Sequence, residues 1–582
     1  MIKRLAKSIR EYKMPSVLTS VTVLLEVLLE VVIPLIMANL IDFGIENGDT
    51  NALTKYGVVL LISALFSLLF GVLAGRFAAV ASCGFAKNLR QDMYYNVQNF
   101  AFSNIDKFST SSIVTRLTTD VNNVQMSYQM IIRQAIRSPF MMIFSLVAAF
   151  GIDAKLSLIF VASVPVLAIG LWLIMGNAHP IFERVFKTYD KLNSVVGENL
   201  HGVRVVKSFA REDFEKNKFE KVSNSIYKDF SKAEKLLAFN GPLMQFCMYA
   251  SMLFISWFGA KAIVLAGGAP DALTTGEFTS LITYTMQILN SLMMVSMLFV
   301  MITISRASAE RICEVLEEGS DIKSPENAKF EVENGSIDFE NVTFSYARKA
   351  EKPVLSNIKL HIKSGETVGI IGVTGSSKSS LVQLIPRLYD VQEGTLSVGG
   401  TDVRDYDLKT LRDSVAVVLQ KNTLFSGTVR DNLKWGDENA TDEEIIKALK
   451  LAEAYSFVSE LEDGLDHMVE QGGANFSGGQ KQRLCIARAL LKKPKILILD
   501  DSTSAVDTAT DKLIRKAFRE EIPDTTKIII AQRIDSVKDS DKIVVMENGE
   551  IIALGNHNEL MESSEIYKDI YSSQQEGGDL DE

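Results

Sequence analysis

Cysteine and histidine are scarce in this sequence, which has four cysteines and five histidines among 582 residues. The cysteines lie far apart, with no Cys-x-x-Cys pair, and the histidines form no cluster with metal-ligand spacing. This pattern argues against both a disulfide-stapled fold and a zinc site. The C-terminal half also lacks basic tracts, and the net charge is −10. We therefore do not expect nucleic acid to be the main partner.

Apolar residues, by contrast, make up 47% of the chain and are unevenly distributed. Apolar runs long enough to cross a membrane fall in the first part of the chain, and the rest is mixed and charged. The sequence therefore predicts a membrane domain followed by a soluble one. We expect a transmembrane domain over 1–310, a linker over 311–335, a soluble domain over 336–570, and an acidic, disordered tail over 571–582.

Six membrane spans are predicted from the apolar runs. At about 1.5 Å per residue, each covers roughly 30 Å of hydrocarbon. The third run is short by itself, and only a helix continuing back to Met130 gives it the required length, with Arg133 and Arg137 at its inner mouth. The expected spans are 16–41, 56–82, 130–152, 155–177, 239–266 and 278–304.

Basic residues predict the orientation of these spans, because Lys and Arg near helix ends remain on the cytoplasmic side. Residues 1–13 carry five of them and residues 178–238 carry twelve. Both termini are therefore expected inside the cell, in a multi-pass protein of the cell membrane. The long inner connections, 83–130 and 178–238, are expected to be helical, either docking on a cytosolic surface at their tips or forming ordinary solvated hairpins.

A strand-like run over 367–371 leads into a glycine- and serine-rich loop and then into a helix-like stretch, the context of a phosphate-binding loop. Backbone N–H groups of such a loop point at phosphates, Lys378 would supply positive charge, and the Ser379 hydroxyl could ligate Mg²⁺. A second apolar run ends in Asp500 and Asp501, where a Mg²⁺-binding acid belongs. The loop residues are Gly372, Val373, Thr374, Gly375, Ser376, Ser377, Lys378, Ser379 and Ser380.

The stretch Ser477, Gly478, Gly479 and Gln480, shortly before Asp500, resembles the signature of ATP-binding-cassette (ABC) proteins. With six spans ahead of it, nearly the whole chain looks like a type IV (exporter-fold) ABC half-transporter. This resemblance implies an all-α six-helix transmembrane domain with long cytosolic helical extensions. An α/β P-loop nucleotide-binding domain that uses ATP and Mg²⁺ would follow it.

The resemblance also implies roles for single residues. Tyr346 would stack on adenine, and Gln420 would sense Mg²⁺ and the membrane domain. Residues 504–507, ending in Asp507, would form the D-loop. Gln532 stands where that family has a switch histidine.

Three positions depart from the family pattern. Asp501 replaces the glutamate that orients the attacking water, Gln532 replaces the histidine, and Ser377 replaces a glycine. All three belong to the phosphate-loop side, whereas the signature is intact. Since the resemblance implies that each ATP lies between one chain's phosphate loop and the other chain's signature, we expect a bacterial heterodimer whose degenerate ATP site is on this chain. A homodimer with two slow sites, an importer and a nucleotide-gated regulator remain as alternatives.

The first span carries Glu26 and Glu30 four residues apart, on one helix face near mid-membrane. Charges there are costly, so the pair should face a cavity or a partner, or be protonated. In a functional interpretation they favour cationic or amphiphilic substrates. In a structural one they accept hydrogen bonds from Ser, Thr or Asn on neighbouring helices, or form a buried pair with Arg76. A drug-like amphiphile is the first expectation for the substrate, with a peptide or lipid behind it.

Overall fold

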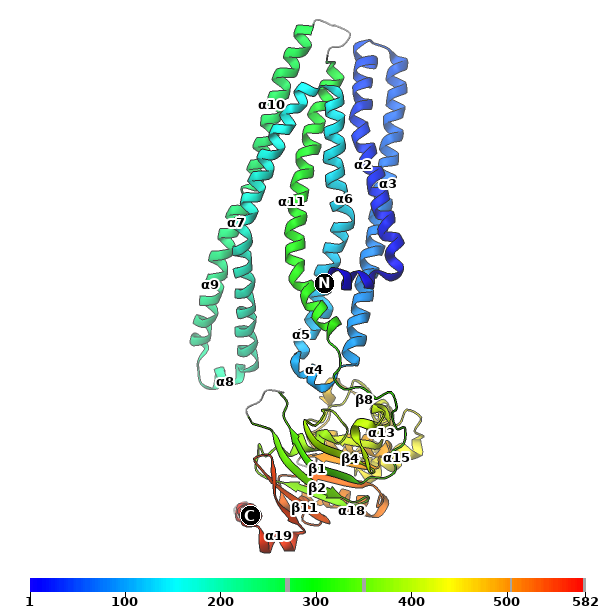
Figure 1. Ribbon diagram of the computed structural model, residues 1–582, viewed down its shortest axis with the longest axis vertical. Helices are drawn as coiled ribbons and strands as arrows, with labels where there is room; N and C mark the ends of the chain where they lie inside the picture. Colours follow the sequence, from blue (N-terminus) through cyan, green and yellow to red (C-terminus); the bar gives the residue numbers. More distant parts are fainter. Residues whose placement is uncertain (267–272, 348–351, 503–504, 579–582) are drawn as a thin grey trace. The chain divides into compact units, whose positions relative to one another are not determined.

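The computed structural model describes residues 1–266, 273–347, 352–502 and 505–578. These residues form two compact units (Figure 1). The first comprises Met1–Gln98 and Thr110–Glu318, and the second comprises Asn99–Ser109 and Gly319–Glu582.

The first unit is entirely helical. Six of its long helical stretches are long and apolar enough to cross a membrane within the described residues, which confirms the expected number of spans. Its elements are α1 (Ile2–Ala6), η1 (Lys7–Tyr12), α2 (Lys13–Asn39), η2 (Leu40–Glu46), α3 (Thr50–Gln98), α5 (Thr110–Thr115), η3 (Arg116–Asp120), α6 (Val121–Ile152), α7 (Ala154–His201), α8 (Val203–Ser208), α9 (Glu212–Leu237), α10 (Asn240–Ala266) and α11 (Thr275–Glu317).

Local capping explains where two of the long helices begin. The Asp153 carboxylate accepts hydrogen bonds from the backbone N–H groups of Lys155 (2.7 Å) and Leu156 (3.0 Å), which separates α7 from α6. Thr274 and Glu277 form a reciprocal capping box at the start of α11. These caps satisfy N–H groups that the helices themselves leave unpaired.

The predicted inner connections are helical. α7 and α9 lie side by side and are joined by the short helix α8, beyond which the Phe209 side chain is 73% exposed (Figure 1). The other connection returns through η3, which two reciprocal ion pairs hold against α11. The Arg311 guanidinium donates to the buried Asp120 carboxylate at 2.8 Å, and Arg116 pairs with Glu314 at 2.8 Å.

The second unit contains two main sheets. The larger has strand order β12-β11-β3-β10-β9-β6, with β12 alone antiparallel to its neighbour, and the smaller is antiparallel with order β2-β1-β4-β5. β3, β9 and β10 are almost fully buried, as expected of central parallel strands. This α/β architecture confirms the predicted fold class. The strands are β1 (Ile337–Phe344), β2 (Leu355–Ile362), β3 (Thr367–Ile371), β4 (Glu393–Val398), β5 (Thr401–Asp402), β6 (Val415–Val418), β7 (Gly427–Thr428), β8 (Met468–Val469), β9 (Ile496–Asp500), β10 (Thr526–Ile530), β11 (Lys542–Glu547) and β12 (Glu550–Gly555).

Helices alternate with these strands along the chain. The helical elements are α4 (Phe102–Lys107), α12 (Lys378–Leu384), η4 (Val403–Asp405), α13 (Leu408–Ser414), α14 (Val429–Leu433), α15 (Asp442–Leu451), α16 (Tyr455–Ser459), η5 (Gly464–Asp466), η6 (Gln471–Gly473), α17 (Gly478–Leu491), α18 (Thr508–Glu521), η7 (Ile534–Ser536), α19 (His557–Ser563) and α20 (Glu565–Gly578). α20 extends through 571–578, so the expectation of a disordered tail is wrong there.

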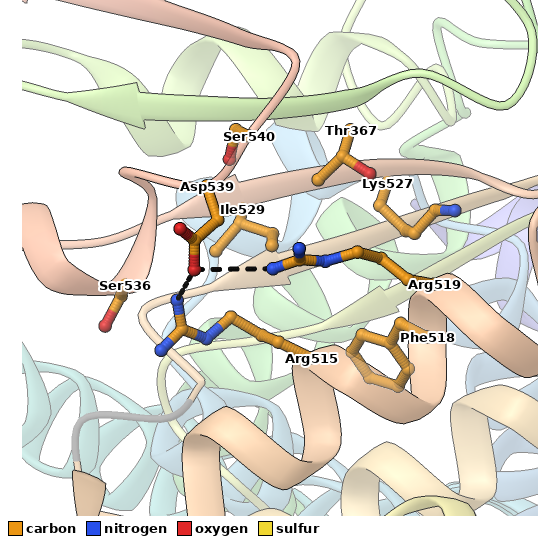
Figure 2. A pocket seen from close by; sticks show the side chains of 9 residues that line it. All are labelled: Thr367, Arg515, Phe518, Arg519, Lys527, Ile529, Ser536, Asp539 and Ser540. Atoms are coloured by element: carbon orange, nitrogen blue, oxygen red, sulfur yellow. Dashed lines mark hydrogen bonds and ion pairs between the residues drawn. The ribbon is translucent and has the colours of Figure 1, made fainter. Parts of the chain in front are cut away.

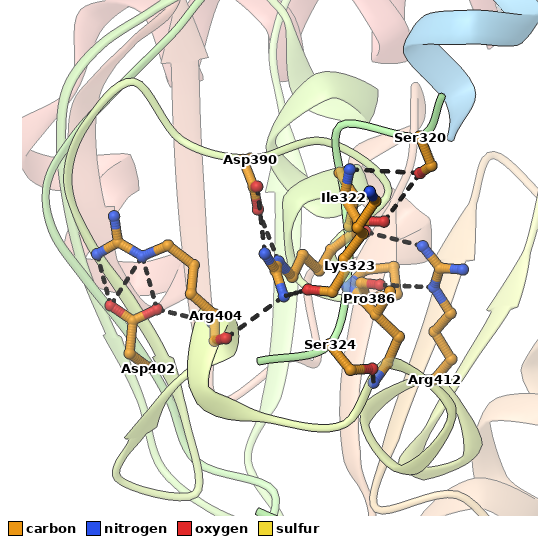
Figure 3. Close-up of polar contacts among 11 residues, drawn as sticks. Ser320, Ile322, Lys323, Ser324, Pro386, Asp390, Asp402, Arg404 and Arg412 are labelled. Carbon is orange, nitrogen blue, oxygen red and sulfur yellow. Dashed lines mark hydrogen bonds and ion pairs between the residues drawn. The ribbon is translucent and has the colours of Figure 1, made fainter. Parts of the chain in front are cut away.

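Residues 320–324 open the C-terminal part of the second unit, and polar contacts hold them in place (Figure 3). The Ser320 hydroxyl donates to the Ile322 carbonyl at 2.8 Å, and the Arg387 guanidinium donates to the Lys323 carbonyl at 3.2 Å. Ser324 donates to the Asp407 carboxylate at 2.9 Å. Hydrogen bonds from the Thr410 N–H and the Ser324 hydroxyl lower the pKa of Asp407. This entry segment is therefore an ordered part of the second unit.

Candidate nucleotide site

The predicted phosphate loop connects β3 to α12. The Lys378 ammonium donates to the carbonyls of Gly372 (2.9 Å) and Val373 (3.0 Å) and to the buried Ser376 hydroxyl (3.2 Å). A Cβ atom at Gly372 would collide with the Met546 carbonyl, so only glycine fits there. Burial lowers the pKa of Lys378. The exposed residues of the loop are Val373, Thr374 and Gly375.

A hydrogen bond between Ser379 and Asp500 joins the phosphate loop to the end of β9. The Ser379 hydroxyl donates to the Asp500 carboxylate at 2.9 Å, and Asp500 is only 5% exposed. Burial raises the pKa of Asp500, and the Ser379 hydrogen bond partly offsets that rise. Hydroxyl and carboxylate oxygens are the ligands that Mg²⁺ prefers beside nucleotide phosphates. These two residues fit the predicted Mg²⁺ role.

Asp501 is the meeting point of two glutamine side chains. The Gln532 amide donates to Asp501 Oδ2 at 2.8 Å, and the Gln420 amide donates to the same oxygen at 3.3 Å. Burial raises the pKa of Asp501, while both amide hydrogen bonds lower it. Gln420 therefore contacts the second carboxylate of the pair, and its predicted contact with Mg²⁺ remains a prediction.

Gln574, on α20, is a supporting residue that sequence reasoning missed. Its amide donates to the Gln532 carbonyl at 2.7 Å and accepts from the Ile534 N–H at 2.9 Å. The end of the chain thus positions the segment that carries Gln532. No local motif marks Gln574, because it lies within the segment taken for a tail.

Ser377 adopts a left-handed backbone conformation, with φ of 69° and ψ of 20°. The Cβ atom of a non-glycine residue crowds the backbone in this region at a cost of about 1–2 kcal/mol. The left-handed angles explain why glycine, the residue that Ser377 replaces in the predicted family pattern, suits this position.

Ser377→Gly is expected to stabilise the soluble domain. Relief of the backbone strain, less the greater freedom of glycine in the unfolded chain, leaves about 0.5–1 kcal/mol. The midpoint of thermal unfolding should rise by about 2 °C. Ser380→Gly, in the right-handed first turn of α12, is the control and should lower it. A lower midpoint for Ser377→Gly would contradict the strain.

Tyr346, the predicted adenine-stacking residue, follows β1 and is 49% exposed. Its hydroxyl forms a hydrogen bond of 2.9 Å with the Ser380 hydroxyl of α12 and donates to the Gln383 side chain at 3.3 Å. These hydrogen bonds hold the hydroxyl end of the ring beside the phosphate loop and leave part of the ring surface exposed. This placement suits a residue that stacks on a base.

The predicted signature forms the start of α17. Ser477 is the N-cap, and its hydroxyl accepts from the Gln480 N–H at 3.3 Å. Gly478 and Gly479 follow, and a Cβ atom at Gly479 would lie 2.8 Å from the Ala505 carbonyl. Gln482, another residue that we did not predict, accepts from the Ala505 N–H at 3.1 Å and holds the D-loop against α17.

Asp507, at the end of the predicted D-loop, caps α18 by accepting from the Thr510 N–H at 2.9 Å. That backbone hydrogen bond lowers the pKa of Asp507. Ser504, at the start of the same loop, lies outside the described residues.

Glu26 and Glu30, the predicted substrate residues of the first span, share one cationic partner. Arg137 of α6 pairs with Glu26 at 2.7 Å and with Glu30 at 2.7 Å. The expected pairing with Arg76 is wrong, since Arg76 is exposed on α3. Arg137, expected at the inner mouth of its span, joins two carboxylates of a neighbouring span. Two carboxylates against one guanidinium leave one excess negative charge.

Arg137→Met is expected to destabilise the helical unit by about 3 kcal/mol, because it leaves two neighbouring, largely buried carboxylates without their counter-ion. The measurement is thermal unfolding in detergent. Arg76→Met is the matched control and should change little. Adding Glu26→Gln and Glu30→Gln to Arg137→Met should restore much of the loss, and a loss that persists in the triple variant would contradict the electrostatic cause.

A small pocket elsewhere in the second unit is not part of this site (Figure 2). Its lining includes Thr367, at the amino end of β3, whereas the phosphate loop follows the carboxyl end. In it, Asp539 lies 3.4 Å from the Arg519 guanidinium and 3.9 Å from that of Arg515. These ion pairs tie α18 to the segment before β11, and ligands of open α/β sheets bind at the opposite edge.

Two family models match the chain. That of the ABC transporter transmembrane region matches residues 17–292, and that of the ABC transporter matches residues 355–504. An uncharacterized ABC transporter ATP-binding protein of Bacillus subtilis, YfiB, is 34% identical over 519 residues, covering 89% of each chain. The ATP-dependent lipid A-core flippase of Desulfotalea psychrophila is 32% identical over 489 residues, covering 84% of each chain.

Among solved structures, a bacterial Atm1-family ABC exporter with ATP bound has the same fold. Its TM-score is 0.83 at 22% sequence identity, and the match covers 97% of this chain and 99% of that chain. The family models, the relatives and the shared exporter fold agree over both units. The chain is a member of the ABC transporter family, a multi-pass membrane protein with the fold of the ABC exporters.

Proposed function

We propose that this chain is the degenerate-site subunit of a heterodimeric, ATP-driven exporter. The proposal rests on Asp501, which stands where the family pattern has glutamate. Its Oδ2 accepts hydrogen bonds from Gln532 and Gln420. Aspartate is one methylene shorter than glutamate, so its carboxylate falls about 1.5 Å short of where a glutamate would hold the attacking water. A misplacement of about 1 Å can cost a hundredfold in rate.

Gln532 is a second reason to expect slow ATP hydrolysis at this site. Its amide can donate a hydrogen bond, but it carries no charge and cannot shuttle a proton as imidazole does. The residues that we propose for binding are Lys378 for the phosphates, Tyr346 for the base, and Ser379 with Asp500 for Mg²⁺. We infer that this chain's own site binds ATP and hydrolyses it slowly.

The intact signature supports an active role in a second site. Ser477, Gly478, Gly479 and Gln480 would face the ATP held by a partner ABC half-transporter, whose glutamate and histidine perform hydrolysis. Closure of the two nucleotide-binding domains around ATP would draw the inner helix tips together and turn the bundle from inward-facing to outward-facing. In this arrangement the protein lies in the bacterial cell membrane with its termini and nucleotide-binding domain in the cytoplasm.

For the substrate we propose an amphiphilic small molecule, with a cationic one favoured by the excess negative charge of Glu26, Glu30 and Arg137. A lipid is the second candidate, since one relative is named as a lipid A-core flippase. Inside-out vesicles holding this chain and its co-purified partner should accumulate a fluorescent cation when ATP is added, and accumulation independent of ATP would contradict export.

Heterodimer formation has a direct test. The tagged chain is purified from its native membrane, and co-purifying proteins are identified by mass spectrometry. ATP turnover is then measured for the chain alone and for the pair. We expect a second ABC half-transporter and brisk turnover only from the pair, whereas brisk turnover by the lone chain would support a homodimer instead.

A further inference from the structure

Tyr346 belongs to a cluster of aromatic side chains that continues away from the phosphate loop. The Tyr389 ring meets the Tyr346 ring edge to face, with centroids 5.1 Å apart and an interplanar angle of 84°. Phe344 packs against both, at 5.0 Å from Tyr346 and 5.6 Å from Tyr389. Such edge-to-face contacts fix the rings relative to one another. The orientation of Tyr346 therefore depends on that of Tyr389.

Tyr389 also holds the short helix α4, which is distant in sequence but belongs to the same compact unit. Its hydroxyl donates to the Asp106 carboxylate at 2.7 Å, and the Phe102 ring meets its ring edge to face at 6.0 Å. Burial and the neighbouring Asp106 charge raise the pKa of Tyr389, so the phenol remains a donor. In chain order, α4 follows α3 and precedes α5, the helices that lead to and from the membrane spans.

We propose that Tyr389 is a positioning residue that links stacking of the adenine base on Tyr346 to the docking of α4. The inference rests on the proposed function, in that it takes Tyr346 as the base-stacking residue. A base lying on Tyr346 restricts that ring, the restricted ring supports one orientation of Tyr389, and that orientation directs the Tyr389 hydroxyl at Asp106. The nucleotide base thus helps to hold α4, separately from what the phosphates do at Lys378.

Thermodynamic linkage gives this coupling a reciprocal signature. If bound ATP strengthens the docking of α4, then docked α4 strengthens ATP binding by the same factor. Removing the Tyr389 hydroxyl, or its acceptor on α4, should therefore weaken ATP binding even though neither group touches the base. A purely structural role for Tyr389 would leave α4 insensitive to nucleotide.

The test is amide hydrogen exchange of residues 99–109 in the full-length protein in lipid nanodiscs. EDTA is present throughout so that ATP binds without hydrolysis. ATP should slow exchange in this segment about fivefold, a typical size for coupling between sites. Inorganic tripolyphosphate, which can occupy the phosphate loop without a base, should slow it less than about twofold.

Three variants and one control sharpen the test. Tyr389→Phe keeps the ring and removes only the hydroxyl, Asp106→Ala removes the acceptor, and Tyr346→Ala removes the stacking surface. Each should reduce the ATP effect on residues 99–109 to less than about twofold. Tyr406→Phe is the matched control, since that tyrosine of the same domain donates to the Val398 carbonyl instead, and it should retain the fivefold effect.

The outcomes separate this inference from the function on which it rests. Affinity for ATP is measured in parallel, and failure of ATP to bind, or binding indifferent to Tyr346→Ala, would overturn the nucleotide role itself. If ATP binds in a Tyr346-dependent way but Tyr389→Phe retains the full slowing, or tripolyphosphate slows exchange as much as ATP, the Tyr389 link is overturned and the proposed function is not.

Discussion

Asp501→Glu combined with Gln532→His is expected to raise the ATP turnover of this chain, purified by itself, about a hundredfold. The longer side chain moves the carboxylate about 1.5 Å outward, towards the position at which it orients water. The exchange at 532 also removes the amide that now donates to Asp501 at 2.8 Å. The measurement is steady-state phosphate release by the lone chain, in which every composite site contains this chain's own intact signature.

One single variant, Gln532→His, and one control, Asp501→Asn, decide how this result is interpreted. Gln532→His by itself should raise ATP turnover only little, because the carboxylate of Asp501 still lies short of the position at which it would orient water. Asp501→Asn in the lone chain should leave the slow rate within about twofold, since a carboxylate already out of position contributes little. A rate that the double variant leaves unchanged would mean that the defect lies outside these two residues.

Much of the fold followed from patterns that act locally along the chain. Apolar runs of spanning length predicted six membrane helices, and the run ending at Ile371 before Gly372 predicted a buried strand entering a phosphate loop. Both features are set by residues close in sequence. The extent of α20 was not predictable in this way, because its position depends on Gln574, which contacts Gln532 and Ile534 across the fold.

The same distinction explains what was missed in the site and in the membrane. That Arg137 pairs with Glu26 and Glu30 depends on the relative register of two helices, which the sequence of neither specifies. The left-handed angles of Ser377 belong to the loop as folded. Tyr389 lies in no motif, and only the tertiary structure brings it beside both Tyr346 and Asp106.

Ser477→Asp is expected to abolish the ATP turnover of the assembled pair, with a loss of at least about a hundredfold. Aspartate caps a helix as well as serine does, so α17 should keep its start. Its negative charge would instead repel the phosphates of the ATP held by the partner. The loss is large because, in the proposed arrangement, this signature belongs to the site that performs hydrolysis.

Asymmetry between the two ATP sites is tested most directly by measuring the pair's ATP turnover with Ser477→Asp and with Asp501→Asn, each as a single change in this chain. Two unequal sites predict a loss of at least about a hundredfold for the first variant and a change of less than about twofold for the second. Similar, large losses for both variants would contradict the asymmetry, because they would show that turnover also requires the acid of this chain's own site.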